Sequence, residues 1–369
     1  MTILHIINNL SHGGAERILV DTAPSYSSLG HDITILQLND KNSSSEYLAT
    51  LERSGIKCLT LGQFGLYSPV KIIQLVNHLN KNDYDILHVH LFPALYWVAI
   101  ASKFTRRQIQ LVFTEHSTEN KRFGKPYLRH LESWIYNSYT KVIVISEAIK
   151  SKLDRWANIT DKIELIRNGV NVNQFIEAKS YPDSYWETQF SIPAGAMKLM
   201  MTARFGFPKD HITLIESLKF LPDYCYLILA GNGPNVEYVK HYVDANGLSN
   251  RIRFAGFRMD IPSLMKSVNL NILSSQYEGM SGVTLEALAS GVPFLGSNVK
   301  GINDVVPDDR FLFEAGNSYA LAQKIDTILF KDIEMQKSMI TEGLKYVRKF
   351  DVSLMIDKHI NLYKGLLKR

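Results

Sequence analysis

Two glutamates separated by seven residues, Glu278 and Glu286, frame the stretch "EGMSGVTLEALASGVP". A carboxylate can accept two hydrogen bonds from vicinal hydroxyls, as acidic residues do for ribose in dinucleotide-binding folds. Glu286 is placed to hold a ribose in this way, and Glu278 to hold hydroxyls of whatever is attached to the phosphates. The alternative is that both are ordinary solvated charges beside a glycine-shaped loop. The spacing alone leaves both interpretations open.

A short helix is expected between the two glutamates. Ser281 is a good N-cap, Gly291 suits the left-handed position after a helix, and Pro293 prevents the helix from continuing. The helix should therefore begin near residue 281 or 282. The backbone N–H groups of Ser281, Gly282 and Val283 would then be free at its positive end, which is suited to binding phosphate.

The bulk composition limits the class of protein. The 369 residues exceed one domain of usual size, so we expect two domains. With 46% hydrophobic and 21% charged residues, the chain should be globular rather than disordered. Cys58 and Cys225 lie far apart, which argues against a disulfide framework or a thiolate metal site. No apolar run reaches the roughly 18 residues of a membrane span, and no signal peptide is recognisable, so we expect a cytoplasmic protein.

Apolar runs of strand length alternate with helical patterns along most of the chain. In the first part, the predicted strands are residues 3–7, 32–38, 85–91, 111–116 and 141–146. A segment rich in Ser, Tyr and Pro follows, from about 177 to 195, and we expect it to be loose. The pattern then restarts, with predicted strand-like segments at 198–204, 225–233, 252–257, 270–275 and 292–297. This alternation indicates α/β domains whose mostly parallel sheets are covered on both faces.

The chain resembles the retaining glycosyltransferases with the two-domain GT-B-type fold, glycosyltransferase family 4 (glycosyl transferases group 1) in particular. The resemblance covers nearly the whole chain, and the motifs are specific because they occur together and in order. They are "HGGAE" (12–16), "TEHS" (114–117), "VIVIS" (142–146), "IRNGVNVNQF" (166–175), "ARFGFPKDH" (203–211), "LILAGNGP" (227–234) and the stretch between the two glutamates.

The resemblance implies two Rossmann-like domains that face each other across a cleft. Residues 1–170 would form an N-terminal acceptor-binding domain, and residues 171–350 a C-terminal domain that binds the nucleotide sugar. Residues 351–369 would form a closing helix that packs back on the N-terminal domain. Closure of the domains is expected, with a hinge near Asn168 and Gly169.

The resemblance also assigns roles in binding the donor. Arg204, Lys209 and the helix start would hold the diphosphate, because fixed cations and N–H dipoles stabilise the charge of the departing phosphate without a metal. Glu286 would hold the ribose and Glu278 the sugar hydroxyls. The expected donor-binding residues are Gly14, Arg204, Lys209, Gly256, Phe257, Arg258, Glu278, Gly279, Met280, Ser281, Gly282, Val283 and Glu286.

Within this set, the base would lie along the backbone of residues 256–258. Gly14 would permit close approach of the backbone to phosphate or acceptor. Gly13 and Glu16 are weaker predictions for the acceptor side. By the resemblance, His116 contacts the donor sugar near its reacting carbon and joins Arg204, Lys209 and Glu278 in the predicted catalytic set. A single histidine after a strand is otherwise more often a structural residue.

The implied reaction moves a hexose or N-acetylhexosamine from a nucleotide-diphosphate sugar, with UDP as the expected carrier and GDP still open. The acceptor would be a saccharide, free or lipid-linked, in bacterial surface polysaccharide or glycolipid synthesis. No cofactor or metal is expected. The anomeric configuration would be retained, with the departing phosphate oxygen deprotonating the acceptor. The alternatives are a sugar-nucleotide epimerase on the same fold and a non-catalytic partner subunit that binds nucleotide sugar.

Two further features bear on partners and on sugar choice. Basic residues interleaved with aromatic ones at 102–108 and 119–130 suggest a peripheral surface for anionic lipid at the inner face of the membrane, although a solvated basic face explains them equally well. No nucleic-acid-binding module is recognisable. The chain departs from the family at Asp210 and at Met280-Ser281, where glycine, or an aromatic residue followed by glycine, is frequent.

Overall fold

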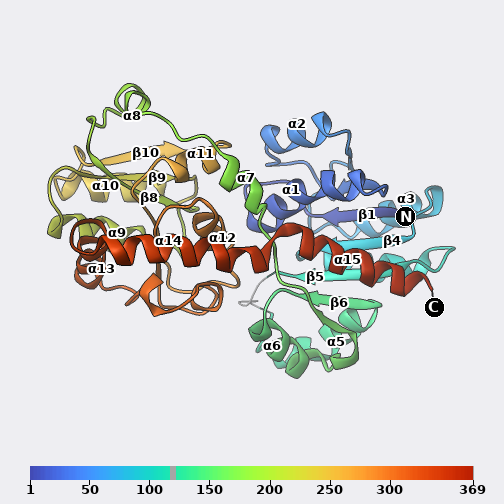
Figure 1. Cartoon of the computed structure of the whole chain (residues 1–369). Coiled ribbons are helices and arrows are strands. Elements are labelled where there is room, and N and C mark those ends of the chain that lie inside the picture. Colours follow the sequence, from blue (N-terminus) through green and yellow to red (C-terminus); the bar gives the residue numbers. More distant parts are fainter. Residues whose placement is uncertain (117–121, 369) are drawn as a thin grey trace. The chain divides into compact units, whose positions relative to one another are not determined.

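The computed structural model describes residues 1–116 and 122–368. The chain divides into two compact units (Figure 1). Unit 1 comprises residues 1–169 and 352–369, and unit 2 comprises residues 170–351. Each unit is a Rossmann-like α/β fold built on one parallel sheet, so the predicted fold class is confirmed.

Unit 1 is built on a seven-stranded sheet in the order β3-β2-β1-β4-β5-β6-β7, and neighbouring strands run parallel. Its strands are β1 (Thr2–Ile7), β2 (Asp32–Gln37), β3 (Lys57–Thr60), β4 (Ile86–His90), β5 (Gln110–Glu115), β6 (Lys141–Val144) and β7 (Ile163–Leu165). The edge strand β3 was not predicted, because its four residues are few and only partly buried.

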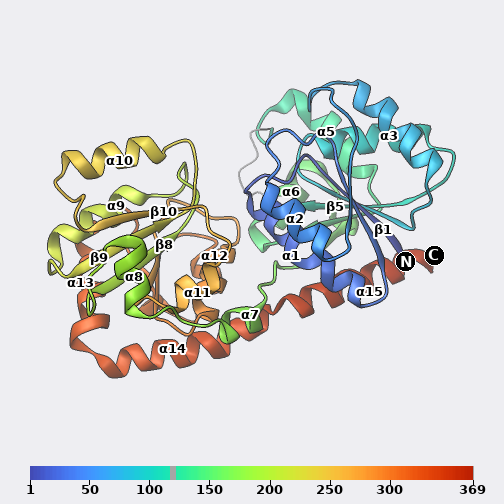
Figure 2. The ribbon, with the colours of Figure 1, turned by 90° about the horizontal axis from the view of Figure 1, so that it is seen from above.

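The helices of unit 1 lie in two layers (Figure 2). They are α1 (Gly14–Ser28), α2 (Ser45–Arg53), α3 (Val70–Lys81), α4 (Ala94–Ala101), α5 (Arg129–Asn137), α6 (Glu147–Ala157) and α15 (Val352–Leu367). Helices α3 to α6 contact one another in succession, and α1 contacts both α2 and α15. The C-terminal helix therefore belongs to unit 1, although unit 2 precedes it in the chain.

Unit 2 has a six-stranded parallel sheet in the order β10-β9-β8-β11-β12-β13. Its strands are β8 (Met197–Thr202), β9 (Cys225–Ala230), β10 (Ile252–Gly256), β11 (Leu270–Leu273), β12 (Phe294–Ser297) and β13 (Leu312–Phe313). These strands are largely buried, as expected when helices cover both faces of a sheet.

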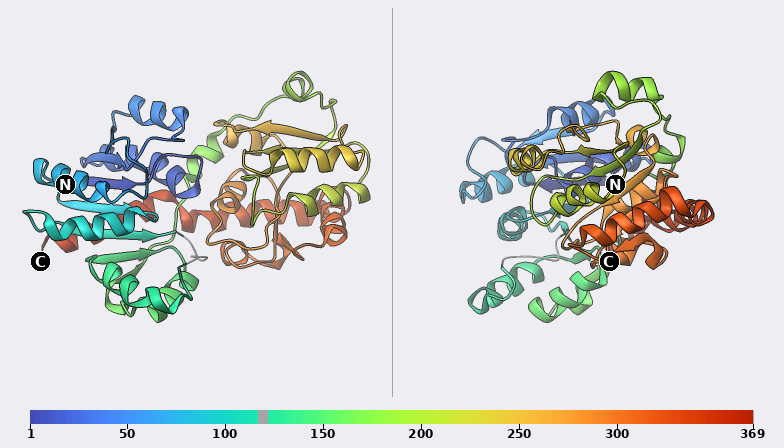
Figure 3. Two further views of the ribbon diagram at one scale, coloured as in Figure 1. Left: turned by 180° about the vertical axis from the view of Figure 1, so that it is seen from behind. Right: turned by 90° about the vertical axis from the view of Figure 1, so that its left-hand side faces the viewer.

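The helices of unit 2 also form two groups by contact, α9, α10 and α13 in one and α7, α11, α12 and α14 in the other (Figure 3). Their bounds are α7 (Val172–Glu177), α8 (Asp183–Phe190), α9 (His211–Ser217), α10 (Val236–Ala245), α11 (Ile261–Lys266), α12 (Gly282–Ala289), α13 (Ser318–Asp326) and α14 (Ile333–Val347). The prediction of a loose segment at 177–195 is wrong, because it contains α8. Burial of Trp186, which is 1% exposed, anchors this helix to the core.

The order of strands reverses between β1 and β4 in unit 1 and between β8 and β11 in unit 2. In open parallel sheets, ligands bind beyond the carboxyl ends of the strands at such a reversal. Two loops meet there in unit 2, residues 203–210 after β8 and residues 274–281 after β11. Across the described residues, every helix is too short or too polar to span a membrane.

Candidate functional site

Backbone hydrogen bonds join the two loops at the strand reversal of unit 2. Lys209 and Ser275 form an isolated antiparallel bridge. The Asp210 N–H donates to the Ser274 carbonyl at 3.0 Å, and the Gln276 N–H donates to the Pro208 carbonyl at 2.9 Å. The loop that carries the predicted cations is therefore held against the loop that carries Glu278.

Two predicted site residues, Lys209 and Glu278, form an ion pair at this junction. The Lys209 ammonium contacts Oε1 of Glu278, and the Ser275 hydroxyl donates to the same oxygen at 2.6 Å. The side chains are only 16% and 13% exposed, so water screens the pair weakly. A ligand that separated the two charges would have to give each a new partner. A phosphate for Lys209 and sugar hydroxyls for Glu278 would meet that requirement.

Arg204 is exposed, and the described residues offer its guanidinium no acidic partner. The backbone on either side of it is fixed by the turn at residues 231–233. The Phe205 N–H donates to the Asn232 carbonyl at 3.0 Å. A Cβ at Gly231 would lie 2.0 Å from the Ala203 carbonyl oxygen, so this turn fits only without a side chain. A held backbone with an unpaired guanidinium is suited to binding an anion.

The predicted helix, which begins after Glu278 and contains Glu286, is present. Helix α12 begins at Gly282, and the Ser281 hydroxyl accepts a hydrogen bond from the Thr284 N–H at 3.2 Å. The prediction of a free Ser281 N–H is wrong. Ser281 has the extended backbone of an N-cap, so its N–H points away from the helix end and donates to the Gly301 carbonyl at 2.9 Å. The N–H groups of Gly282 and Val283 have no acceptor within residues 1–116 and 122–368.

Gly301 holds the loop of Glu278 from the opposite side, and sequence reasoning missed it. Its φ is +82°, and a Cβ here would lie 2.5 Å from the carbonyl oxygen of Glu278. The preceding residue, Lys300, accepts a hydrogen bond from the Glu278 N–H at 3.1 Å. Residues 300 and 301 thus hold the two ends of the segment from Glu278 to Ser281. The only signal in the sequence is one glycine in "NVKGIN".

Replacing Gly301 with alanine should reduce both stability and activity. The left-handed backbone and the clash with Glu278 together should cost roughly 3 kcal/mol in the free energy of unfolding. Gly316 is the matched control, because its φ is +76° but a Cβ there meets nothing within 4 Å. Gly316→Ala should cost only about 1 kcal/mol. Urea unfolding measures both variants, and equal costs would contradict the role of Gly301.

Other predicted donor residues have clear local roles. Glu286 lies in the second turn of α12 and is half-buried, as are Gly279 and Met280 before it. The Met280 side chain packs on the hydrophobic core of unit 2, which accounts for one departure from the family pattern. Asp210 caps α9, because its carboxylate accepts from the Thr213 N–H at 3.1 Å, and this accounts for the other.

The backbone predicted to bind the base is partly engaged within unit 2. The Gly256 carbonyl accepts a hydrogen bond from the Gly231 N–H at 2.7 Å, so one of its two lone pairs is used. Phe257 is half-buried. Arg258 donates from two nitrogens to Asp260, at 2.8 and 2.6 Å, and to the Tyr185 hydroxyl at 2.8 Å. Its side chain therefore stabilises contacts to α8 and α11.

In unit 1, the glycine-rich motif forms the start of α1. Gly13 is the N-cap residue, and Gly14 is the first helical residue, with open space where a Cβ would stand. Glu16 is 7% exposed and accepts a hydrogen bond from the Ser11 hydroxyl at 3.1 Å. This burial favours a structural role for Glu16 at the helix start.

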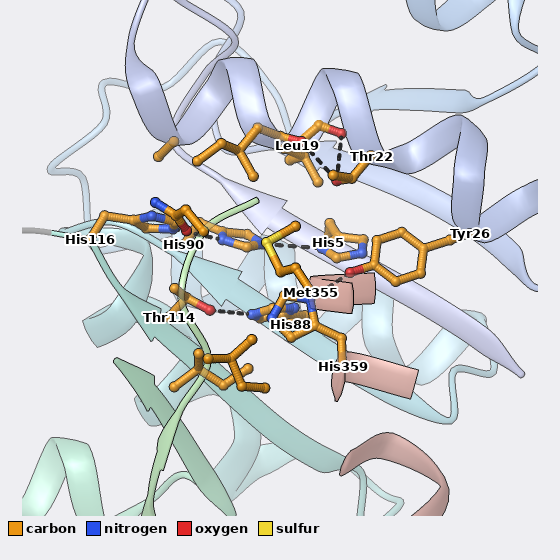
Figure 4. Close-up of a pocket in the computed structure, with 15 residues that line it drawn as sticks. His5, Leu19, Thr22, Tyr26, His88, His90, Thr114, His116, Met355 and His359 are labelled. Carbon is orange, nitrogen blue, oxygen red and sulfur yellow. Dashed lines mark hydrogen bonds between the residues drawn. The ribbon is translucent and has the colours of Figure 1, made fainter. Parts of the chain in front are cut away.

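A row of histidines lies at the strand reversal of unit 1 (Figure 4). His5 on β1 is in register with His88 on β4, and His90 is two residues further on the same face. His116 follows β5, two residues beyond Thr114, the register partner of His90. His5 Nδ1 lies 3.1 Å from His90 Nε2, and His90 Nδ1 lies 3.2 Å from His116 Nε2. The residue after His116 in the predicted "TEHS" motif, Ser117, lies outside the described residues.

Helices α1 and α15 cover this row of histidines. The Tyr363 hydroxyl lies 2.6 Å from His88 Nδ1, and the Tyr26 hydroxyl lies 2.5 Å from His359 Nδ1. His88 Nε2 lies 2.6 Å from the Thr114 hydroxyl. Met355 and Asn168 also line the pocket that contains these histidines. Histidines inside the apolar runs "ILHII" and "ILHVH" were the available signal for this cluster, but we predicted only strands there.

Burial of these imidazoles makes the stability of unit 1 depend on pH. Burial lowers the pKa of His5 and of His359 to about 3, and that of His116 to about 4. In the unfolded chain such groups titrate near pH 6.5, so below that pH the unfolded state binds more protons than the folded state. The stability present above about pH 6.5 is therefore lost as pH falls, by about 1.4 kcal/mol per pH unit for each imidazole.

The expected result is a marked decrease in the free energy of unfolding between pH 7.5 and 5.5, measured by urea unfolding. His5→Phe should remove one imidazole from the dependence and reduce the slope by about 1.4 kcal/mol per pH unit. His241 is exposed on α10, and His241→Gln serves as the control that should leave the slope unchanged. Identical slopes for wild type and His5→Phe would contradict the prediction.

Comparison with known proteins places this arrangement in a family. Residues 12–174 match the family model for Glycosyltransferase Family 4, and residues 186–346 match the one for Glycosyl transferases group 1. The chain belongs to this glycosyltransferase family. The recognition made from the sequence motifs is therefore confirmed.

This glycosyltransferase is similar in sequence or structure to several named glycosyltransferases and related proteins. It is 26% identical over 312 residues to the UDP-Gal:alpha-D-GlcNAc-diphosphoundecaprenol alpha-1,3-galactosyltransferase of Escherichia coli, covering 79% of this chain and 80% of the relative. It is 25% identical to the putative glycosyltransferase EpsD of Bacillus subtilis, covering 80% of each. The crystal structure of HepE from Anabaena in complex with UDP and glucose matches with a TM-score of 0.84 and 25% identity, over 99% of this chain and 100% of HepE.

Proposed function

We propose that this glycosyltransferase moves a hexose or N-acetylhexosamine from a UDP-sugar to a saccharide acceptor, with retention of configuration and without a metal. The observation that carries the proposal is the site at the strand reversal of unit 2. There an exposed Arg204, the paired Lys209 and the two N–H groups at the start of α12 supply positive potential for a diphosphate. Glu278 and Glu286 supply carboxylates for hydroxyls on either side of it.

The chemistry follows from where charge develops. As the bond between the sugar carbon and the phosphate oxygen breaks, negative charge grows on the diphosphate, and Arg204, Lys209 and the α12 N–H groups stabilise it. The acceptor oxygen bonds to the same carbon on the same face, and its proton passes to the departing phosphate oxygen. In this scheme Glu278 binds sugar hydroxyls and is no nucleophile.

The relatives favour UDP as the carrier. HepE was crystallised with UDP and glucose, and the name of the Escherichia coli relative specifies UDP-Gal. Relatives named as lipopolysaccharide core biosynthesis glycosyltransferases favour a saccharide acceptor in the synthesis of a surface glycolipid. The chain's own contribution to choice of sugar lies in Glu278, Gly279 and Met280, which sit between the cations and α12.

Isothermal titration with UDP, GDP, ADP and CMP in the presence of EDTA tests the proposal. We expect UDP to bind and the other three to bind at least tenfold more weakly. UDP-glucose, UDP-galactose and UDP-N-acetylglucosamine are then tested for transfer to candidate saccharides, with the anomer identified by NMR. Absence of UDP binding, or a product of inverted configuration, would overturn it. An epimerase would instead convert the donor without any acceptor, and a non-catalytic subunit would bind UDP without turnover.

A lipid-linked acceptor and a peripheral membrane location are supported by one surface of unit 1. Tyr127, Leu131 and Trp134 are 75%, 44% and 46% exposed, and their spacing of four and three residues places them on one face of the segment ending in α5. Lys125 and Arg129 are exposed beside them. Exposed aromatic and aliphatic residues flanked by cations suit an interface with anionic lipid. Residues 119–121 of the predicted basic stretch lie outside the described residues.

This surface predicts binding to anionic vesicles. Leu131→Asp combined with Trp134→Asp should lower partitioning onto vesicles of phosphatidylglycerol and phosphatidylethanolamine by about tenfold or more, because buried apolar area is lost and negative charge is gained. Ile73→Asp is the matched control, since Ile73 on α3 is also exposed, at 63%. Flotation measures the bound fraction. Equal binding of both variants, or binding that ignores anionic lipid, would refute the membrane surface.

A further inference from the structure

Three histidines of unit 1 form a continuous chain of ring nitrogens. His5 Nδ1 faces His90 Nε2 at 3.1 Å, and His90 Nδ1 faces His116 Nε2 at 3.2 Å (Figure 4). The three residues come from β1, β4 and the end of β5, which are adjacent in the sheet. The strand register thus fixes the relative positions of His5 and His90, and the helices that cover these two rings keep them from solvent.

Burial keeps all three rings neutral at physiological pH, since it lowers the pKa of each histidine. A neutral imidazole has one N–H group and one lone pair. Two hydrogen bonds in series therefore allow only two proton arrangements. In the first, His5 donates to His90 and His90 donates to His116. In the second, every donor and acceptor is reversed.

The ring nitrogen at the His5 end of the three-histidine chain selects between the two proton arrangements. His5 Nε2 is buried and has no hydrogen-bond partner among the described residues. The first arrangement leaves a lone pair there, and the second leaves an N–H group. Buried N–H groups without an acceptor are rarer in proteins than buried acceptors without a donor. The first arrangement is therefore favoured.

The neighbouring polar groups have other hydrogen-bond partners and do not bond to His5 Nε2. His88 has both ring nitrogens at hydrogen-bond distance from hydroxyls, of Tyr363 at 2.6 Å and Thr114 at 2.6 Å. His359 Nδ1 is engaged with the Tyr26 hydroxyl at 2.5 Å. His5, His88 and His90 are close enough to share a metal ion. In this structure, however, ring-to-ring and ring-to-hydroxyl contacts use both nitrogens of His88 and of His90.

We propose that His5 and His90 are positioning residues that hold His116 as the Nδ1–H tautomer, so that His116 presents a hydrogen-bond donor to the donor sugar and cannot act as a general base. The inference rests on the proposed function and on the role that the family resemblance assigns to His116, which is contact with the donor sugar near its reacting carbon. It adds the proton state of His116 and the two buried residues that determine it. His116 Nε2 accepts a hydrogen bond from His90. The proton of the His116 ring is therefore on Nδ1, which faces away from His90.

The proton state is measured by NMR on the full-length protein with ¹⁵N-labelled histidine at pH 7.5. Long-range ¹H–¹⁵N correlations distinguish the two neutral tautomers, and single His→Gln variants assign the signals. We expect the Nδ1–H form at His5, His90 and His116. An Nε2–H form at His116 would overturn the proposal. A shift of the His5 and His88 signals on addition of stoichiometric zinc would also overturn it, because the ion would then occupy the lone pairs.

Two variants of similar shape separate positioning from structure. In His90→Asn the side-chain amide can still donate to His116 Nε2, whereas His90→Leu offers no donor. We expect His90→Asn to retain the His116 tautomer and kcat within about threefold, and His90→Leu to lose both, with kcat lower by roughly tenfold and donor KM little changed. His88→Phe is the control for a buried histidine outside the chain, and it should leave the His116 tautomer unchanged.

The outcomes distinguish this inference from the function on which it rests. Equal loss of activity in His90→Asn and His90→Leu, with equal loss of folding, would show that the three histidines have only a structural role. That result would overturn the proposal. A changed tautomer in His90→Leu with wild-type kcat would overturn the role of His116 at the sugar. Neither result would affect UDP binding by unit 2, which tests the proposed function separately.

Discussion

Arg204→Ala should lower the turnover number of sugar transfer by about 100- to 1000-fold and weaken UDP binding, while the midpoint of thermal unfolding stays within about 1 °C of wild type. The large effect on activity is expected because Arg204 is an exposed, unpaired cation at the strand reversal of unit 2. It would face the diphosphate as negative charge grows there. The small effect on folding is expected because no contact within the described residues depends on its guanidinium.

Two controls accompany this prediction. Arg348 is an exposed arginine at the end of α14 in the same unit, and Arg348→Ala should leave both UDP affinity and turnover unchanged. Arg204→Lys should fall between wild type and alanine, since lysine keeps the charge but cannot form the paired N–H contacts of guanidinium. UDP affinity of Arg204→Ala within twofold of wild type, measured by titration, would show that the diphosphate binds elsewhere.

Glu278→Gln and Glu286→Gln should change UDP affinity in opposite directions, although each removes one negative charge. In the free protein, Glu278 pairs with Lys209 and so competes with a phosphate for that cation. Its replacement should release Lys209 and tighten UDP binding by about three- to tenfold, because a like charge near the diphosphate is also lost. Transfer should nonetheless fall by at least 100-fold, because the sugar hydroxyls lose a charged hydrogen-bond acceptor.

Glu286→Gln should instead weaken UDP binding by about tenfold or more, because the ribose hydroxyls lose a charged acceptor. Titration with UDP gives both affinities, and the transfer assay gives the rates. Weakening of UDP binding in both variants would show that Glu278 assists the diphosphate site and does not compete for Lys209.

The sequence predicted those parts of the site that depend on local rules. Ser281 as an N-cap and Gly291 in the left-handed position both follow from short-range preferences, and α12 confirms them. The free N–H of Ser281 was a wrong prediction, because its acceptor is the carbonyl of Gly301, twenty residues away. A similar separation in sequence hides the contact between Gly301 and Glu278. No local pattern encodes such long-range contacts.

Sequence reasoning was weakest where the local residue pattern and the tertiary contacts favour different interpretations. A central parallel strand should be apolar on both faces, and "ILHVH" satisfies that rule except at His88 and His90. These histidines become meaningful only when the strand order places β1 beside β4 and brings His5 into contact with them. Similarly, the serine, tyrosine and proline residues near α8 suggested a loop, but burial of Trp186 stabilises a helix.

Unit 1 is assembled from two distant segments of the chain, residues 1–169 and α15, with all of unit 2 between them. On the ribosome, unit 2 is complete before the last helix of unit 1 has been synthesised. Tyr363 and His359, the hydrogen-bond partners of His88 and Tyr26, emerge only after all of unit 2 has been synthesised. While unit 2 is being synthesised, His88 and Tyr26 in the N-terminal segment therefore lack these hydrogen-bond partners. Residues 170–351, in contrast, can fold as one uninterrupted piece. Premature termination before α15 would leave a complete unit 2 attached to an incomplete unit 1.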